Sequence, residues 1–158
     1  MPPGYTDSEI IAAGYSIPQL KSGGFDALTL SDNGYSLSQL YTHYTATELK
    51  AANFLLSELK VYFNATELKV ALYTATELKP YFTLQQLIDA GYTATELITA
   101  QYTLVNLYEV NYPVSTLYTL NYTATEVYNA GYVVLSDLKT AGYTATNVKT
   151  LFTLQELF

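Results

Sequence analysis

The chain has 158 residues, of which 49% are hydrophobic, 15% aromatic and only 13% charged. This composition excludes intrinsic disorder, because the apolar surface suffices for a core. Fourteen acidic and seven basic side chains give a formal net charge of −7, and the lysines do not cluster, so we expect neither nucleic acid nor an anionic membrane as a partner. With no cysteine there are no disulfides or thiolates. No apolar run reaches the roughly 20 residues of a membrane span, so we expect no membrane insertion.

Aromatic residues recur every nine to eleven residues from one end of the chain to the other. Five residues after almost every one of them stands Leu, Ile or Val; after Tyr132 the aliphatic residue comes one position later, at Leu138. Self-similarity at a fixed period indicates a repeat architecture. We identify sixteen repeats over residues 1–158, beginning near Tyr5, Tyr15, Phe25, Tyr35, Tyr44, Phe54, Phe63, Tyr73, Phe82, Tyr92, Tyr102, Tyr112, Tyr122, Tyr132, Tyr143 and Phe152.

Each repeat carries the start signal of an α-helix, clearest in residues 44–49. Thr45 is placed to cap the helix, and Glu48, three residues later, completes a capping box. The flanking Tyr44 and Leu49 occupy the positions of a hydrophobic staple. The cap position holds Ser, Thr, Asp or Asn in thirteen of sixteen repeats and fails only at Leu55, Pro113 and Val133.

Helix ends are signalled as well. Gly or Asn precedes the aromatic residue in ten repeats, and these residue types tolerate the left-handed conformation that often follows a helix. Glutamates gather in the first turn and lysines follow the aliphatic residue, so both complement the helix dipole. The pattern predicts helices of seven or eight residues and no strands.

Helices this short are not stable alone in water, so neighbouring repeats must supply the stability. The residue two after the aromatic tends to alternate between small, as at Ala46, and large, as at Leu37, and nine-residue spacings recur every nineteen residues. We therefore predict an all-α fold: an α-solenoid of about sixteen very short helices with a two-helix unit of 19 to 20 residues.

The segment from Gly91 to Leu97, Gly-Tyr-Thr-Ala-Thr-Glu-Leu, resembles the short decapeptide helical arrays of various predicted bacterial and viral proteins. The resemblance covers essentially the whole chain. It implies a helical array and brings no single function with it.

No constellation of catalytic or metal-binding residues is recognisable. The single histidine, His43, stands where Gly or Asn usually ends a helix, which favours a turn residue over a ligand. Regularly spaced glutamates such as Glu48 and Glu96 could suggest cation sites, but the capping box explains their spacing. We expect no enzymatic activity and no cofactor or metal.

Four tyrosines stand where other repeats carry lysine, a position that we expect to face solvent. An aromatic strip there would mark an interface. The alternative is that the rings fold back over a neighbouring helix. These candidates are Tyr41, Tyr108, Tyr118 and Tyr128.

The terminal repeats are apolar and in register, although solenoid ends are usually polar. If one copy abutted the next, Phe152 and Tyr5 would stand eleven residues apart, close to the internal period. With Leu157 and Phe158 they form the second candidate interface, and they predict head-to-tail self-association into a filament. The alternative is a monomeric scaffold that binds an unidentified protein, a peptide or a carbohydrate. The compartment stays open, with an extracellular or surface-appendage location favoured.

Overall fold

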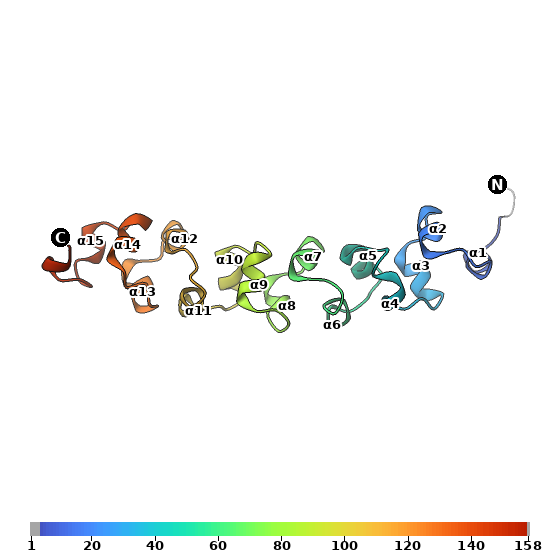
Figure 1. Ribbon diagram of the computed structural model, residues 1–158, viewed down its shortest axis with the longest axis horizontal. Helices are drawn as coiled ribbons and strands as arrows, with labels where there is room; N and C mark the ends of the chain where they lie inside the picture. The colour runs from blue at the N-terminus through green and yellow to red at the C-terminus, as the bar shows by residue number, and fades with distance from the viewer. Residues whose placement is uncertain (1–3, 158) are drawn as a thin grey trace. The chain divides into compact units, whose positions relative to one another are not determined.

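The structure is a computed structural model that describes residues 4–157. Within this range the chain forms fifteen α-helices, one 3-10 helix and no strand (Figure 1), which confirms the all-α prediction. The helices have four to seven residues, and all but α14 are shorter than the seven or eight residues expected. They are α1 (Asp7–Ala12), α2 (Ile17–Ser22), α3 (Ala27–Asp32), α4 (Leu37–Leu40), α5 (Ala46–Ala51), α6 (Leu56–Leu59), α7 (Ala65–Val70), α8 (Ala75–Leu78), α9 (Leu84–Asp89), α10 (Ala94–Thr99), α11 (Leu104–Glu109), α12 (Val114–Thr119), α13 (Ala124–Asn129), α14 (Leu135–Ala141), α15 (Ala145–Val148) and the 3-10 helix η1 (Leu154–Leu157).

Most of the helices begin at the predicted capping boxes, whereas α3, α12 and α14 have none. The backbone N–H of Thr45 donates to the Glu48 carboxylate at 2.7 Å, and the backbone N–H of Glu48 donates to the Thr45 hydroxyl at 3.2 Å. Such a cap contributes about 1 kcal/mol over alanine. Helix α14 differs from the prediction, since it is preceded by Val134 and not by Val133. The extra residue of this repeat therefore lies before the helix.

The ten-residue repeats end in a left-handed turn. Leu72, at φ 59°, donates its N–H to the Lys69 carbonyl at 2.8 Å, and the next N–H, of Tyr73, reaches back to Leu68 at 3.1 Å. This pair of bonds is the Schellman motif. Gly and Asn occupy the left-handed position at the predicted sites, but Leu72 and Gln101 adopt it without that signal.

The nine-residue repeats omit this turn. Their helices α4, α6, α8 and α15 have only four residues, and none of them is followed by a left-handed residue within residues 4–157. After α4, the Tyr44 N–H bonds the Leu40 carbonyl, four residues back instead of five. The missing residue of a short repeat is therefore the left-handed one.

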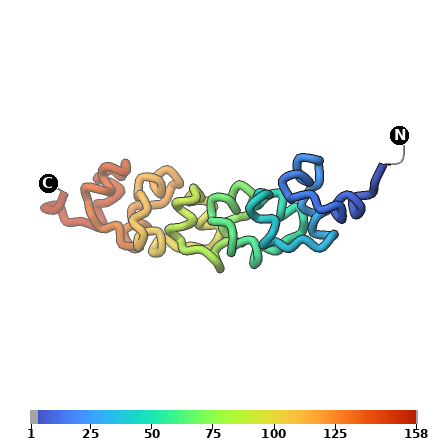
Figure 2. The backbone as a smooth tube through the Cα atoms, turned by 45° about the vertical axis from the view of Figure 1, so that its right-hand side comes forward, coloured from blue at the N-terminus to red at the C-terminus, as the bar shows by residue number. Residues whose placement is uncertain are grey.

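Contacts divide the chain into two compact units, Met1–Tyr73 and Thr74–Phe158. In the first unit α3 packs on α5 and α5 on α7; in the second α8 packs on α10, α12 on α14 and α13 on α15. Figure 1 shows α11 to α14 alternating between two edges of the second unit, and Figure 2 shows the same succession of short helices from another side. Packing between second neighbours confirms the two-helix unit.

The aliphatic residue of each repeat forms the core of each unit. From α2 to α15 these side chains are at most 2% exposed: Leu20, Leu30, Leu40, Leu49, Leu59, Leu68, Leu78, Leu87, Leu97, Leu107, Leu117, Val127, Leu138 and Val148. Burying a side chain of this size stabilises the fold by about 1.5–3 kcal/mol.

Several tyrosines of the aromatic position also join second neighbours through their hydroxyl groups. Tyr44 donates to the Phe25 carbonyl at 2.7 Å, and Tyr143 donates to the Tyr122 carbonyl at 2.6 Å. A buried hydroxyl needs such a partner, and here it satisfies a backbone acceptor in return.

Candidate interaction surface

The residue that follows the core aliphatic side chain links repeats that lie three apart. Lys50 donates through Nζ to the carbonyls of Ala71 at 2.9 Å and Leu72 at 3.1 Å. The same ammonium lies 3.8 Å from the centroid of the Tyr73 ring. We call this kind of contact a repeat joint. It connects the residue after the core aliphatic side chain of one repeat with the aromatic residue that begins the repeat three places later, and with the residues just before that aromatic. Lys79 forms an equivalent repeat joint with Ala100 O at 2.8 Å, Gln101 O at 2.9 Å and the Tyr102 ring at 4.3 Å.

Lys21 forms a repeat joint that includes an ion pair. Its Nζ donates to the His43 carbonyl at 2.7 Å, lies 4.4 Å from the Tyr44 ring centroid and pairs with Glu48 at 2.9 Å. Burial raises the pKa of Glu48, but hydrogen bonds from the Thr45 backbone and from Lys21 outweigh it, so the pKa is lowered from its usual value. His43 lies in a turn, as predicted, and only its carbonyl takes part here.

The expectation that the lysine position faces solvent is wrong for these three residues. Lys21, Lys50 and Lys79 are partly buried because each lies over the aromatic ring of a later repeat. Their ammonium groups bond carbonyls at the end of a helix, where the dipole favours a cation.

The tyrosines at this position form repeat joints of a second kind. Tyr108 and Tyr118 are 42% and 40% exposed, yet each packs edge-on against an aromatic ring three repeats onward. The rings are therefore folded over a later repeat and still keep part of their surface exposed, and their role as an interface stays a prediction. The ring centroids are 5.2 Å apart for Tyr108 and Tyr132, 4.9 Å for Tyr118 and Tyr143, 5.4 Å for Tyr128 and Phe152, and 4.3 Å for Tyr41 and Tyr62, where the later ring precedes the aromatic position.

Two of these rings need a glycine beneath them. A Cβ atom at Gly131 would lie 2.5 Å from the Tyr108 ring, and one at Gly142 would lie 2.6 Å from the Tyr118 ring. Both glycines also have φ near +115°, which residues with a Cβ rarely adopt. The tyrosine of one repeat and the glycine three repeats later therefore form a matched pair.

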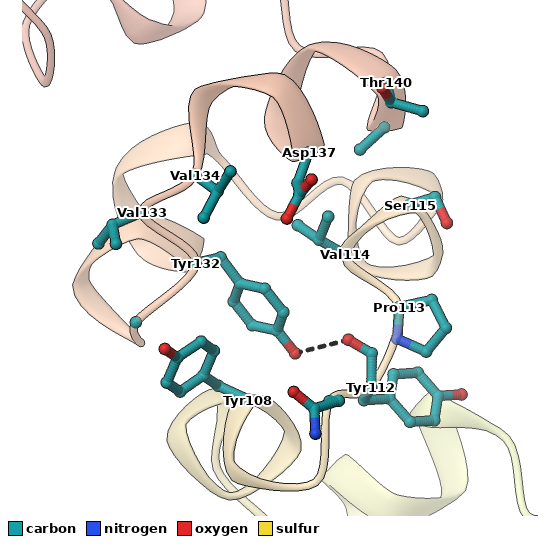
Figure 3. Close-up of a pocket in the computed structure, with 13 residues that line it drawn as sticks. Tyr108, Tyr112, Pro113, Val114, Ser115, Tyr132, Val133, Val134, Asp137 and Thr140 are labelled. Atoms are coloured by element: carbon teal, nitrogen blue, oxygen red, sulfur yellow. Dashed lines mark hydrogen bonds between the residues drawn. The ribbon is translucent and has the colours of Figure 1, made fainter.

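A groove of about 380 Å³ lies where the repeat pattern is least regular. Figure 3 shows the Tyr132 ring crossing it, with the hydroxyl on the Tyr112 carbonyl at 2.9 Å. Tyr108, Pro113 and Asp137 lie around this ring. Burial, followed by the neighbouring tyrosines, raises the pKa of Tyr132 to about 12. Sequence reasoning missed the groove, although Pro113 and the extra residue after Tyr132 both mark the place.

A second groove, of about 780 Å³, lies in the first three repeats. Its apolar lining includes Tyr5, Ile10, Tyr15, Leu20 and Phe25. Tyr5 is 83% exposed and Tyr15 is 51% exposed, whereas aromatic residues of later repeats, such as Tyr44, are as little as 3% exposed. We call this surface the N-terminal groove.

The other predicted interface residues lie around η1. Phe152 and Leu157 are partly buried, and Leu154 between them is 73% exposed. Phe158 lies outside the described residues. The contact of these side chains with Tyr5 remains a prediction about two copies of the chain.

In residues 4–157 no group of three or more His, Asp or Glu side chains is arranged to hold a metal ion. None of the helices of that part of the chain has the length and apolar character needed to cross a bilayer.

The short capped helices, their shared leucine core and the repeat joints define a helical-repeat protein of the α-solenoid class. The family model of the decapeptide repeat region matches residues 62–134 and 81–155, which together cover more than half of the chain. The chain belongs to this family, and the resemblance seen in its sequence is confirmed. Searches of curated proteins and of solved structures gave no match.

Proposed function

We propose that the chain is a non-enzymatic structural repeat protein whose copies associate head to tail. The observation that carries the proposal is the N-terminal groove. Tyr5 and Tyr15 are exposed there, whereas the aromatic residue at the same position of a later repeat, such as Tyr44, is buried. An apolar surface of this kind favours contact with another helical repeat.

The partner surface is supplied by the repeats around η1. Leu154 is 73% exposed there, and the chain continues the same aromatic and aliphatic spacing through Phe152 and Leu157. Such a contact joins one surface of a copy to a different surface of the next copy and is therefore heterologous. It generates an open filament unless the rotation closes a ring.

The expected strength follows from the side chains involved. Burying a large apolar side chain contributes roughly 1.5–3 kcal/mol. A few such residues only just offset the roughly 4–15 kcal/mol that association costs. Assembly should therefore depend steeply on protein concentration and reverse on dilution.

Sedimentation velocity over a concentration series, with electron microscopy of the concentrated samples, tests the proposal. Wild-type protein should grow into larger species, and Tyr15→Lys should remain monomeric, because a charge would be placed in the N-terminal groove. Val70→Lys is the matched control, since Val70 is 72% exposed and lies outside that groove. A wild-type protein that stays monomeric at every concentration would overturn the proposal.

A second function is favoured by the groove around Tyr132. Aromatic-lined grooves bind extended peptides, and here the exposed Val133 and Val134 extend the apolar surface. Replacing Tyr108, Tyr118 and Tyr128 with lysine, followed by titration with a proline-rich peptide and an oligosaccharide, separates the two functions. A binding scaffold should lose its ligand and stay folded, whereas head-to-tail assembly should persist.

A further inference from the structure

The repeat joints have a direction. In the lysine examples a repeat donates an ammonium group to the third repeat onward, as Lys50 does to Ala71 and Leu72. The acceptors are the two carbonyls just before the aromatic residue, and that aromatic ring lies beneath the ammonium. Each complete joint therefore needs a donor from three repeats earlier in the array.

The second repeat presents the acceptor half of such a joint without its donor half. The corresponding carbonyls belong to Ala13 and Gly14, and no donor within residues 4–157 bonds either of them. Ala13 is exposed, whereas Ala71 and Ala100, its equivalents in complete joints, are each 2% exposed. Tyr15, the ring that would lie beneath an ammonium group, is 51% exposed.

The first repeat presents a carboxylate that, like these carbonyls, stands at the position of a joint acceptor. Glu9 holds the position that Glu48 holds in the joint of Lys21, and Asp7 stands beside it in the first turn of α1, which has no basic residue in its last turn. Hydrogen bonds from the backbone and hydroxyl of Thr6 lower the pKa of Glu9, so it is charged at neutral pH. This surface therefore favours a cation.

Two lysines present the donor half without an acceptor. Lys139 and Lys149 follow the core residues Leu138 and Val148, which is the position of every joint-forming lysine. Both are exposed, and neither has a hydrogen-bond or ion-pair partner within the described residues.

We propose that these lysines complete repeat joints with a second copy of this chain. Lys149 of one copy donates to the carbonyls of Ala13 and Gly14 above the Tyr15 ring of the next, and Lys139 pairs with Glu9. The inference rests on the proposed head-to-tail association and adds its register, because the repeat of Lys139 must then lie three repeats before that of Tyr5.

Charge-reversal variants test the proposed pair between Lys139 of one copy and Glu9 of the next. Lys139→Glu and Glu9→Lys should each weaken association about fivefold to tenfold in sedimentation equilibrium, because each places like charges opposite one another. The double variant should recover most of this loss, because every contact then pairs opposite charges again, with the two signs exchanged between the copies. Asp89→Lys is the control for net charge, since Asp89 is exposed and lies outside both surfaces.

Glu9 also caps helix α1, so a second variant separates charge from folding. Glu9→Gln keeps the capping acceptor, as Gln19 does for Ser16 in the next repeat, where the backbone bond is 2.9 Å. It should lower the affinity without lowering the helix content measured by circular dichroism.

Lys149→Met tests the second joint and should weaken association about tenfold, with the difference shrinking at high salt. If wild-type protein associates and Tyr15→Lys abolishes this, but Lys149→Met and the reversals have no effect, then this register is wrong and the proposed function stands. If wild-type protein does not associate at all, both are overturned.

Discussion

The joints built on lysine and those built on tyrosine solve one geometric problem with different chemistry. In both, the residue after the core aliphatic side chain must cover the aromatic residue three repeats later. Lys50 does so with a cation that bonds two carbonyls, and Tyr118 does so with a ring that packs edge-on against Tyr143, with 4.9 Å between the two ring centroids. The backbone can keep the same repeat because either side chain spans the same gap.

The difference lies in what each joint demands of its partner. The cation of Lys50 needs only carbonyls, so it tolerates Leu72 at the left-handed position. The ring of Tyr118 occupies the space of a Cβ and therefore requires Gly142. A lysine joint thus restricts sequence little, whereas the joints of Tyr108 and Tyr118 each couple a tyrosine to a glycine.

The core should be common to both kinds of joint, and breaking it should have the largest effect. Leu49→Ala and Leu117→Ala, both at fully buried positions, should each lower the free energy of unfolding by about 2–5 kcal/mol. Chemical denaturation measures this loss. A large difference between the two variants would contradict an equivalent core beneath the two kinds of joint.

Gly142→Ala should break a tyrosine joint. The new Cβ would overlap the Tyr118 ring, at about 1–3 kcal/mol beyond the backbone strain at positive φ. Gly14→Ala is the control, because it also has positive φ but nothing lies within 4 Å of its Cβ. Adding Tyr118→Ala should reduce the cost of Gly142→Ala; equal costs at Gly14 and Gly142 would contradict the matched pair.

Lys50→Met should break a lysine joint at a cost of about 1 kcal/mol, since the bonds of the ammonium are partly exposed. Lys139→Met, measured at a concentration where the protein is monomeric, should change stability by less than about 0.5 kcal/mol. Denaturation at low and high salt compares them. Equal effects at both sites would mean that the joint of Lys50 adds nothing.

The smallest expected effect is a loss of stability at alkaline pH at a tyrosine joint, that of Tyr108 with Tyr132. The pKa of Tyr132 is raised to about 12, above the value near 10 of an unfolded chain. The folded state therefore holds this proton more tightly, and the stability that it supplies is complete below pH ~10 and lost as the pH rises towards 12. Tyr132→Phe should lessen that loss, as followed by denaturation and tyrosinate absorbance.

Much of the fold could be predicted from local signals. The capping box of Thr45 and Glu48 and the left-handed Gly14 depend on residues close together in the sequence, so the sequence displays them directly. Leu72 escaped prediction because leucine does not favour positive φ; the side chain is 82% exposed, and the two Schellman hydrogen bonds stabilise the turn. Helix η1 is a 3-10 helix although its sequence continues the α-helical pattern.

The repeat joints could not be read from neighbouring residues, because they connect side chains more than twenty positions apart. One signal was present: Lys21, Lys50, Lys79 and Tyr108 recur at equal intervals along the chain. The spacing does not give the orientation of the side chain, so it cannot say whether the side chain points to water or to the repeat three places later. Only the packed structure distinguishes these, as the wrong expectation for the lysine position illustrates.

The central claim is that each short helix is stabilised by repeats one to three positions away and not by the whole chain. Circular dichroism and thermal melting of the separate fragments 1–73 and 74–158, which correspond to the two compact units, test it most directly. The account predicts that both fragments are helical and melt cooperatively, at lower temperature than the full chain. Two fragments without helix would contradict it.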